Sequence, residues 1–278
     1  MEAKVWKLLC FVITVMCALL VAHSVYAVGV TSMIRVGEAP QGIAYDFGRG
    51  EIFVANSGDN TVSVISESTN KVVATIPVGT KPVSVAYYSS KGEIFVSNHQ
   101  GGTISVISDS TTNTIATVPV GIGAEPADLV YDSGRGEIFV TNFGTESISV
   151  ISDNNNTVVA NTPIETPPYN LAYDSGKSEV FVANAEDNAT SVISDRTNTV
   201  VTKHLIVGNY PVGVAYDSEM NEIFFTNSAD STISVISDRT NAVVATVKVG
   251  TAPVGIAYDS SRGEIFVANS GENTVSII

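Results

Sequence analysis

The chain has 278 residues, of which 44% are hydrophobic, and a formal net charge of −14. Such an acidic chain repels phosphate backbones, so we expect no nucleic-acid partner. The charge suits solubility, cation-rich surroundings or a basic partner. Both cysteines, Cys10 and Cys17, lie near the N-terminus. The rest of the chain therefore has no disulfide, thiol nucleophile or cysteine-based metal site.

Residues 1–27 have the layout of a secretory signal peptide. Two lysines precede an apolar stretch at 8–22, and Val25-Tyr26-Ala27 offers a small-residue cleavage site. The stretch of about 15 residues is short for a membrane span of about 20, although an uncleaved N-terminal anchor remains an alternative. We expect a secreted, extracellular or cell-surface protein whose mature region, 28–278, is one domain without a further membrane span.

The mature region repeats a unit of about 42 residues six times, which indicates a repeat architecture. The central run of the unit reads EIFVANSGDNTVSVIS (51–66), GEIFVSNHQGGTISVIS (92–108), GEIFVTNFGTESISVIS (136–152), SEVFVANAEDNATSVIS (178–194), NEIFFTNSADSTISVIS (221–237) and GEIFVANSGENTVSII (263–278). A residue present in every copy is expected to build the unit, because chemistry usually needs only one site.

The first unit parses into four extended segments, 42–46, 51–56, 61–66 and 71–79, separated by turns rich in Gly, Asn and Asp. β-Branched residues dominate and no segment has a helical period, so the fold is predicted to be all-β. The second segment is apolar on both faces, which indicates a strand covered on both sides. Proline and lysine in the fourth segment mark an outer edge strand at Pro77, Pro119, Pro163 and Lys248.

These features predict a β-propeller of four-stranded antiparallel blades. Linker prolines place six blade starts near residues 40, 82, 126, 168, 211 and 253. The last unit stops after its third strand, while residues 32–37 match the end of a fourth strand. We therefore expect the N-terminal strand to complete the last blade; the alternative is a fragment of a longer array.

The runs FVAN, FVSN, FVTN, FVAN, FFTN and FVAN, each followed by a turn and a VSVI-like strand, resemble the YVTN β-propeller repeat of surface-layer and exported proteins. The resemblance covers about residues 32–278. It implies an extracellular or periplasmic propeller used for adhesion, surface-layer assembly or ligand binding, and it implies no particular reaction. Members of this family are often described with seven blades, so a count of six is a departure.

Polar residues that recur in every unit are interpreted as architecture. An asparagine ends each second segment, and Asp and Glu flank the turn before it, as Asp46 and Glu51 do in the first unit. Turns such as 57–60 and 185–188 offer oxygen ligands for calcium but lack the spacing of an EF-hand loop, so no cofactor is expected. The mature chain has two histidines, His99 and His204, in different units, which argues against a two-histidine metal site.

Departures from the repeat are the better pointers to a binding site. They gather at the rim formed by the linkers between units and by the turns between the second and third strands. The candidate residues at this mouth of the ring are Ser84, His99, Glu125, Asp128, Tyr169, Asn170, Asn209 and Tyr210. Asn155 and Asn188 begin N-glycosylation sequons at predicted turns.

We expect a non-catalytic binding or surface-layer scaffold module whose partner is a protein or a cell-surface polymer. The alternative is a lactonase- or lyase-like propeller enzyme with its site at the same mouth, because a fold does not decide function.

Overall fold

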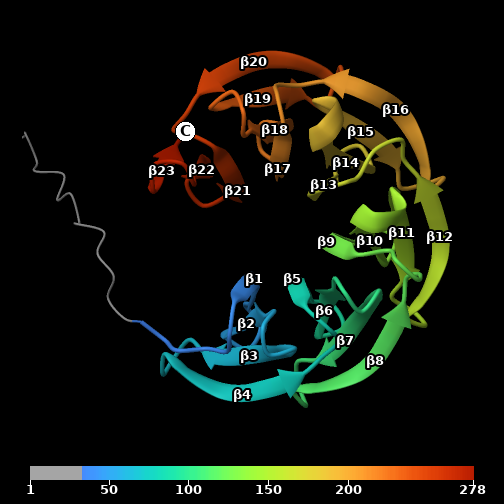
Figure 1. The fold of residues 1–278 in the computed structure, drawn as a ribbon, viewed down its shortest axis with the longest axis vertical. Coiled ribbons are helices and arrows are strands. Elements are labelled where there is room, and N and C mark those ends of the chain that lie inside the picture. Colours follow the sequence, from blue (N-terminus) through green and yellow to red (C-terminus); the bar gives the residue numbers. More distant parts are fainter. Residues whose placement is uncertain (1–32) are drawn as a thin grey trace, which may run out of the picture. The chain divides into compact units, whose positions relative to one another are not determined.

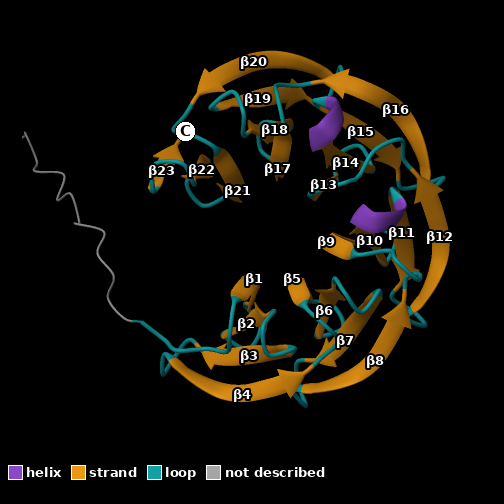
Figure 2. Cartoon of the chain, in the orientation of Figure 1, coloured by secondary structure: helices purple, strands orange, loops and turns teal. Residues whose placement is uncertain are grey.

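The computed structural model describes residues 33–278, so the expected signal peptide lies outside the described residues. The described chain is all-β apart from two short 3-10 helices, η1 (Phe143–Thr145) and η2 (Ala185–Asp187). Its strands form six antiparallel sheets, one for each repeat, around a common centre (Figure 1, Figure 2). The protein is a six-bladed β-propeller. Within residues 33–278, no helix is long and apolar enough to cross a membrane.

The first three blades consist of β1 (Pro40–Asp46), β2 (Glu51–Asn56), β3 (Thr61–Ser66) and β4 (Lys71–Pro77); β5 (Pro82–Tyr88), β6 (Glu93–Asn98), β7 (Thr103–Ser108) and β8 (Asn113–Pro119); and β9 (Pro126–Asp132), β10 (Glu137–Asn142), β11 (Ser147–Ser152) and β12 (Thr157–Pro163). The last three consist of β13 (Leu171–Asp174), β14 (Glu179–Asn184), β15 (Ala189–Ser194) and β16 (Thr199–Ile206); β17 (Pro211–Asp217), β18 (Glu222–Asn227), β19 (Thr232–Ser237) and β20 (Ala242–Lys248); and β21 (Pro253–Asp259), β22 (Glu264–Asn269) and β23 (Thr274–Ile277).

Strands within a blade pair in chain order, with the first strand nearest the centre and the fourth at the circumference (Figure 1). The predicted outer edge is confirmed, because Pro77, Pro119, Pro163 and Lys248 end the outermost strands β4, β8, β12 and β20. Proline has no N–H to donate to a further strand, so these edges do not invite pairing.

The core consists of five clusters of buried apolar side chains, each shared by two consecutive blades. In the first cluster along the chain, Phe53 and Val62 of blade one pack with Ile94 and Val96 of blade two. In blade two, Ile94 and Val96 of β6 pack toward blade one and Phe95 packs toward blade three, which confirms the expected covering on both sides for this second strand. The equivalent strand β2 of blade one is packed against a neighbouring blade on one face only.

The recurring aspartates build the hairpins between first and second strands. Asp46 Oδ1 accepts hydrogen bonds from Gly48 N at 2.8 Å and Arg49 N at 3.1 Å, and Arg49 pairs with Glu51 at 3.2 Å. The same turn recurs at Asp132, Asp174, Asp217 and Asp259. The structural interpretation of these carboxylates is confirmed.

Blade four begins later than predicted, at Leu171 instead of near residue 168. In the other blades, the residue before the linker proline has a positive φ, as in Tyr210 (φ 55°). Pro167 holds this position in blade four, and its ring fixes φ near −65°. The chain therefore approaches β14 differently, with Tyr169 N donating to Ala183 O at 3.0 Å.

The expected completion of blade six by residues 32–37 is corrected by the structure. The sheet of β21, β22 and β23 has three strands, and the described part of that segment forms no strand. Gly37 N instead donates to Asn56 Oδ1 at 3.2 Å and Glu38 N to Asp59 Oδ2 at 2.6 Å, so the segment serves as the linker of blade one.

The ring is consequently open between blades six and one (Figure 1). Ile43 of blade one is 66% exposed, whereas the equivalent Val85 of blade two is 7% exposed. Val275 and Ile277 on the facing side of blade six are also exposed. Two apolar blade faces therefore lie without a partner among the described residues, and we call this opening the seam.

Candidate functional site

The structure brings part of the predicted mouth together across blades two, three and four. Ser84 Oγ donates to Asp128 Oδ1 at 2.8 Å, and Leu171 N donates to Asp128 Oδ2 at 3.2 Å. One carboxylate therefore links the inner strands of three blades. Burial raises the pKa of Asp128, against the hydrogen bonds from Ser84, Leu171 N and Leu129 N, which lower it.

Asp128 takes a position in the first strand of its blade that is glycine in blades one, five and six and carries a side chain in blades two to four. In blade one the position is Gly42, where an added Cβ would lie 2.6 Å from Val83 O. Glycine thus allows neighbouring inner strands to approach closely. Ser84, Asp128 and Asn170 replace it in blades two, three and four, at the part of the rim where the candidate site lies.

Three aromatic rings follow the rim from blade three to blade five. The rings of Phe143 and Tyr169 are 5.4 Å apart at an interplanar angle of 86°, and those of Tyr169 and Tyr210 are 5.9 Å apart at 63°. The two tyrosine hydroxyls are 3.0 Å apart. Burial, the Tyr210 hydroxyl and the charge of Glu186 raise the pKa of Tyr169 to about 12.

A hollow of about 290 Å³ lies beside these rings, and we call it the rim hollow. Its walls are mostly apolar and are formed by His99, Ala127, Phe143, Pro168, Tyr169 and Asn170. His99 Nδ1 is buried and has no hydrogen-bond partner. A concave apolar site with a few polar groups is the usual form of a ligand site.

Phe143 is the residue of this site that the sequence-based prediction missed. It takes the first position of the turn between second and third strands, the position that His99 takes in blade two. Blades one and six have serine there, and the hydroxyls of Ser57 and Ser270 bond to linker carbonyls. Aligning these turns would have singled out Phe143 together with His99.

Five of the predicted residues do not line the hollow, namely Ser84, Glu125, Asp128, Asn209 and Tyr210. Asn209 is held by its own blade, with N and Nδ2 each 2.7 Å from a carboxylate oxygen of Asp230. The side chain of Glu125 is exposed, and its backbone carbonyl accepts the Phe143 N–H at 3.2 Å. Asn209 is thus a structural residue, and Glu125 stands beside the hollow without lining it.

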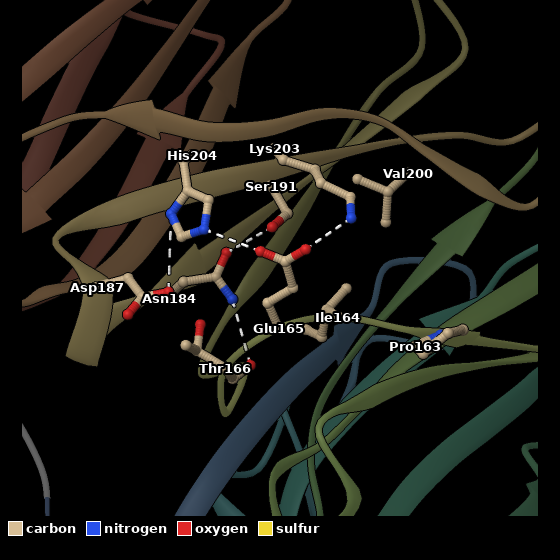
Figure 3. Close-up of a pocket in the computed structure, with 10 residues that line it drawn as sticks. All are labelled: Pro163, Ile164, Glu165, Thr166, Asn184, Asp187, Ser191, Val200, Lys203 and His204. Atoms are coloured by element: carbon tan, nitrogen blue, oxygen red, sulfur yellow. Dashed lines mark hydrogen bonds and ion pairs between the residues drawn. The ribbon is translucent and has the colours of Figure 1, made fainter.

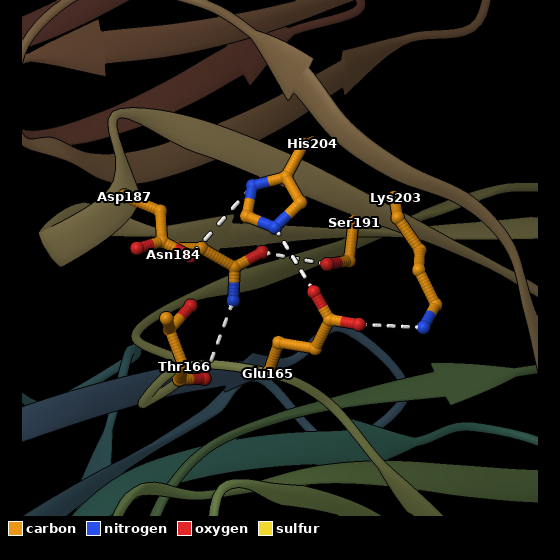
Figure 4. A network of polar contacts seen from close by, with 7 residues as sticks. All are labelled: Glu165, Thr166, Asn184, Asp187, Ser191, Lys203 and His204. Atoms are coloured by element: carbon orange, nitrogen blue, oxygen red, sulfur yellow. Dashed lines mark hydrogen bonds and ion pairs between the residues drawn. The ribbon is translucent and has the colours of Figure 1, made fainter.

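A second polar cluster lies between blades three and four, where Glu165 meets Lys203 and His204 (Figure 3, Figure 4). Glu165 Oε1 is 2.6 Å from Lys203 Nζ, and Glu165 Oε2 is 3.0 Å from His204 Nε2. Hydrogen bonds from Lys203 and His204 lower the pKa of Glu165. Asp187 Oδ2 lies 3.7 Å from His204 Nδ1, so the two carboxylates meet different nitrogens of the ring. The hollow here holds about 20 Å³, room for one water.

This cluster arises from two departures from the repeat that the sequence-based prediction did not use. Glu165 stands where most other linkers have glycine, such as Gly208 before blade five. β16 has one residue more than the other fourth strands, and the extra residue forms a bulge in which Lys203 and His204 both oppose Ser191. His204 has φ 50° there.

The asparagine of blade four responds to this change. In blade five, Asn227 Nδ2 donates to Thr232 Oγ1 at 3.0 Å and Ser234 Oγ at 2.9 Å, while its Oδ1 accepts from Gly208 N at 3.0 Å. In blade four, Asn184 Oδ1 accepts from Ser191 Oγ at 2.8 Å instead. The regular ring of asparagines is thus structural, as predicted, with one reoriented member.

The two sequons differ in their surroundings. Asn155 is exposed in the turn before β12, and Thr157 Oγ1 donates to its Oδ1 at 2.8 Å. Asn188 Oδ1 accepts from Tyr210 N at 2.8 Å, and Thr190 of its sequon is fully buried. Glycosylation of either remains a prediction. Across residues 33–278, no group of three or more His, Cys, Asp or Glu side chains is placed to hold a metal ion.

No protein-family model matches the chain, and no curated protein matches it. Solved structures do resemble its fold. The hydrazine synthase of Kuenenia stuttgartiensis is 14% identical with a TM-score of 0.61 and matches 90% of this chain and 98% of its own. A streptogramin B lyase is 16% identical with a TM-score of 0.71, and the match spans 87% of this chain and 83% of the lyase chain. A protein of unknown function from Desulfotomaculum acetoxidans is 15% identical with a TM-score of 0.71, over 81% of this chain and 78% of its own.

Identities this low show the fold alone. The class that the structure defines is the β-propeller, and the similar structures include proteins of that class. Neither the blade repeat nor the comparisons decide between enzyme and binding protein, because propellers host both kinds of function. The resemblance to the YVTN repeat remains a prediction.

Proposed function

We propose that this chain is a non-catalytic, secreted or cell-surface propeller that binds a partner through the rim hollow. The observation that supports this most directly is the hollow itself, with apolar walls and the buried, unpartnered His99 Nδ1. A YVTN-type propeller would use such a rim for adhesion or for contacts within a surface layer. The partner is a cell-surface protein or polymer.

The titratable groups of the described chain favour binding over catalysis. Both carboxylate oxygens of Asp128 accept hydrogen bonds, from Ser84 Oγ and Leu171 N, and these bonds link neighbouring blades. Glu165 and His204 are paired with each other at the circumference, away from the rim hollow. General acid–base catalysis needs such groups within reach of one substrate. A lactonase- or lyase-like enzyme remains the alternative function.

The proposal is tested by capture from cell-surface extract of the source organism with the tagged full chain. Phe143→Ser and His99→Ser install the serine of blades one and six, and Ser57→Ala at the equivalent position of blade one is the control. We expect the captured partner to be lost with the two rim variants and retained with the control. Equal capture by all four proteins, or turnover of a lactone that survives both rim substitutions, would contradict the proposal.

A further inference from the structure

The loops of the candidate-site rim carry more acidic than basic side chains. Five of the six blades carry acidic residues in the loops of the candidate-site rim, namely the linkers before the blades and the turns between second and third strands: Glu38, Asp59, Glu125, Glu146, Glu165, Glu186, Asp187, Asp230 and Glu272. Blade two has none. Among the described residues, the only lysine or arginine side chains in these loops belong to Arg35 and Lys81. The loops of the opposite rim carry both signs of charge, with the basic residues Arg49, Lys91, Arg135, Lys177, Arg196, Arg239 and Arg262 and the acidic residues Glu67, Asp109, Asp153, Asp195, Glu219 and Asp238. The candidate-site rim therefore attracts cations.

Three of these acidic residues stand near the rim hollow. Glu125 accepts the Phe143 N–H through its carbonyl, Glu146 directly follows η1, and the charge of Glu186 acts on Tyr169. All three are exposed, and within residues 33–278 none of them has a salt-bridge partner. Their charge is therefore available to a partner, unlike that of Glu165, which is paired with Lys203.

The walls of the rim hollow suit the same kind of group. A cation placed over an aromatic face is attracted by the ring, and Phe143 and Tyr169 provide two rings nearly perpendicular to one another. An arginine guanidinium can stack on such a ring while its N–H groups reach acceptors at the edge. His99 and Asn170 line the same space, and a histidine ring nitrogen without a proton and the oxygen of an asparagine side-chain amide are both hydrogen-bond acceptors.

We propose that the rim hollow accepts an arginine or lysine side chain presented by a basic segment of a partner protein. The inference rests on the proposed function and names its ligand class. The hollow of about 290 Å³ has room for one side chain and not for a folded element, so the partner offers an exposed segment. The acidic loops around it attract the remaining basic residues of that segment. Anionic polymers are repelled by the same charge.

Lys81 is the one basic side chain on the blade-two side of the hollow, where its carbonyl accepts the His99 N–H at 2.9 Å. Its charge opposes a cationic ligand. Removing that charge should therefore strengthen binding, which gives the proposal a gain-of-affinity test that loss of folding cannot imitate.

The test uses the full chain and a fluorescent peptide of Gly and Ser with three spaced arginines, read by fluorescence anisotropy at about 50 mM and 150 mM salt. The matched peptide has citrulline at the three positions, which keeps the shape and removes the charge. We expect Phe143→Ser and Tyr169→Val to weaken arginine-peptide binding about tenfold. Glu186→Gln should weaken it about threefold and Lys81→Gln strengthen it about twofold, with larger effects at the lower salt. Glu272→Gln on blade six, far from the hollow, is the control that should leave it unchanged.

Equal binding of the citrulline peptide, absence of arginine-peptide binding to the wild-type chain, or equal affinity of wild type and Phe143→Ser would each overturn the proposal. So would tighter binding of a neutral cell-surface oligosaccharide that Phe143→Ser abolishes. If cell-surface capture still depends on Phe143 while the arginine peptide fails to bind, the proposed function stands and the ligand class is wrong. If capture does not depend on Phe143, the proposed function itself fails.

Discussion

Ser84 and Asp128 join the inner strands of blades two and three through a hydrogen bond of 2.8 Å. The equivalent positions of blades one, five and six are glycines, where the backbones themselves define the spacing. Replacing close backbone contact with a hydrogen-bonded pair changes the rim at three consecutive blades. The rim hollow lies beside those same blades, so the break in the repeat and the candidate site have one structural origin.

Asp128 should make stability depend on pH in a recognisable direction. Its pKa in the folded chain is raised by burial above the ordinary value of 3.8. Below that value the group is protonated in both states. As pH rises, the unfolded chain loses this proton first, so the folded state is penalised and stability falls until the folded pKa is passed. The Asp128→Asn variant has no such titrating group, so its stability should not fall in this way. Urea unfolding at pH 3.5 and 7 should show that the free energy of unfolding of the variant rises, relative to that of the wild type, from the lower to the higher pH.

Asp259 provides a control of opposite sign for that experiment. Hydrogen bonds from Ser261 lower its pKa, so its contribution to stability is present above the unfolded pKa and is lost as pH falls. Asp259→Asn should therefore lose stability relative to wild type at pH 7 and not at pH 3. Parallel pH profiles for the two variants would contradict both assignments.

Two equivalent glycines should respond differently to alanine. A Cβ at Gly42 would lie 2.6 Å from Val83 O, so Gly42→Ala should cost about 1–3 kcal/mol of unfolding free energy. At Gly255 the nearest atom would be Ala268 Cβ at 3.7 Å, an ordinary contact, and Gly255→Ala should cost less than about 1 kcal/mol. Urea unfolding measures both. Equal losses would show that close approach is not what glycine serves here.

The repeated features of this fold were predictable because the same residue pattern occurs in six copies of the unit. The apolar pattern of the second strands predicted covering on both faces, as found for β6; Pro77 predicted the outer edge, and Asp46 predicted the hairpin. The prediction for residues 32–37 was wrong because their sequence resembles the end of a fourth strand, whereas Gly37 and Glu38 form part of the linker of blade one.

The candidate site was predictable only in part because its residues occur once. Asp128 and Asn170 stood out against glycine in a strand. Phe143 lies in a turn where several residue types fit, so its apolar side chain became meaningful only when Tyr169 of the next blade lay against it. His204 required knowing that an extra residue forms a bulge and turns the ring toward Glu165.

In a host that carries out N-glycosylation, we expect only one of the two sequons to be modified. Asn155 and Thr157 of its sequon are both exposed, and their hydrogen bond joins only each other, so we expect modification there. Asn188 is bonded to Tyr210 N and Thr190 is buried, so we expect none. Mass spectrometry of the secreted chain, with Asn155→Gln and Asn188→Gln as matched variants, measures both sites. A glycan on Asn188 would show that this loop opens before modification.

Because of the seam, we expect alanine substitution of two equivalent phenylalanines to lower the free energy of unfolding by unequal amounts. Phe53 is fully buried between blades one and two, so Phe53→Ala should cost about 3–5 kcal/mol. Phe266 of blade six takes the same position in its strand but faces the seam and is only half-buried. Phe266→Ala should therefore cost less than about 2 kcal/mol, because less apolar area leaves water there on folding. Chemical denaturation of both variants measures the difference. An equal cost would mean that the blade-six face is covered in solution, by closure of the ring or by another molecule.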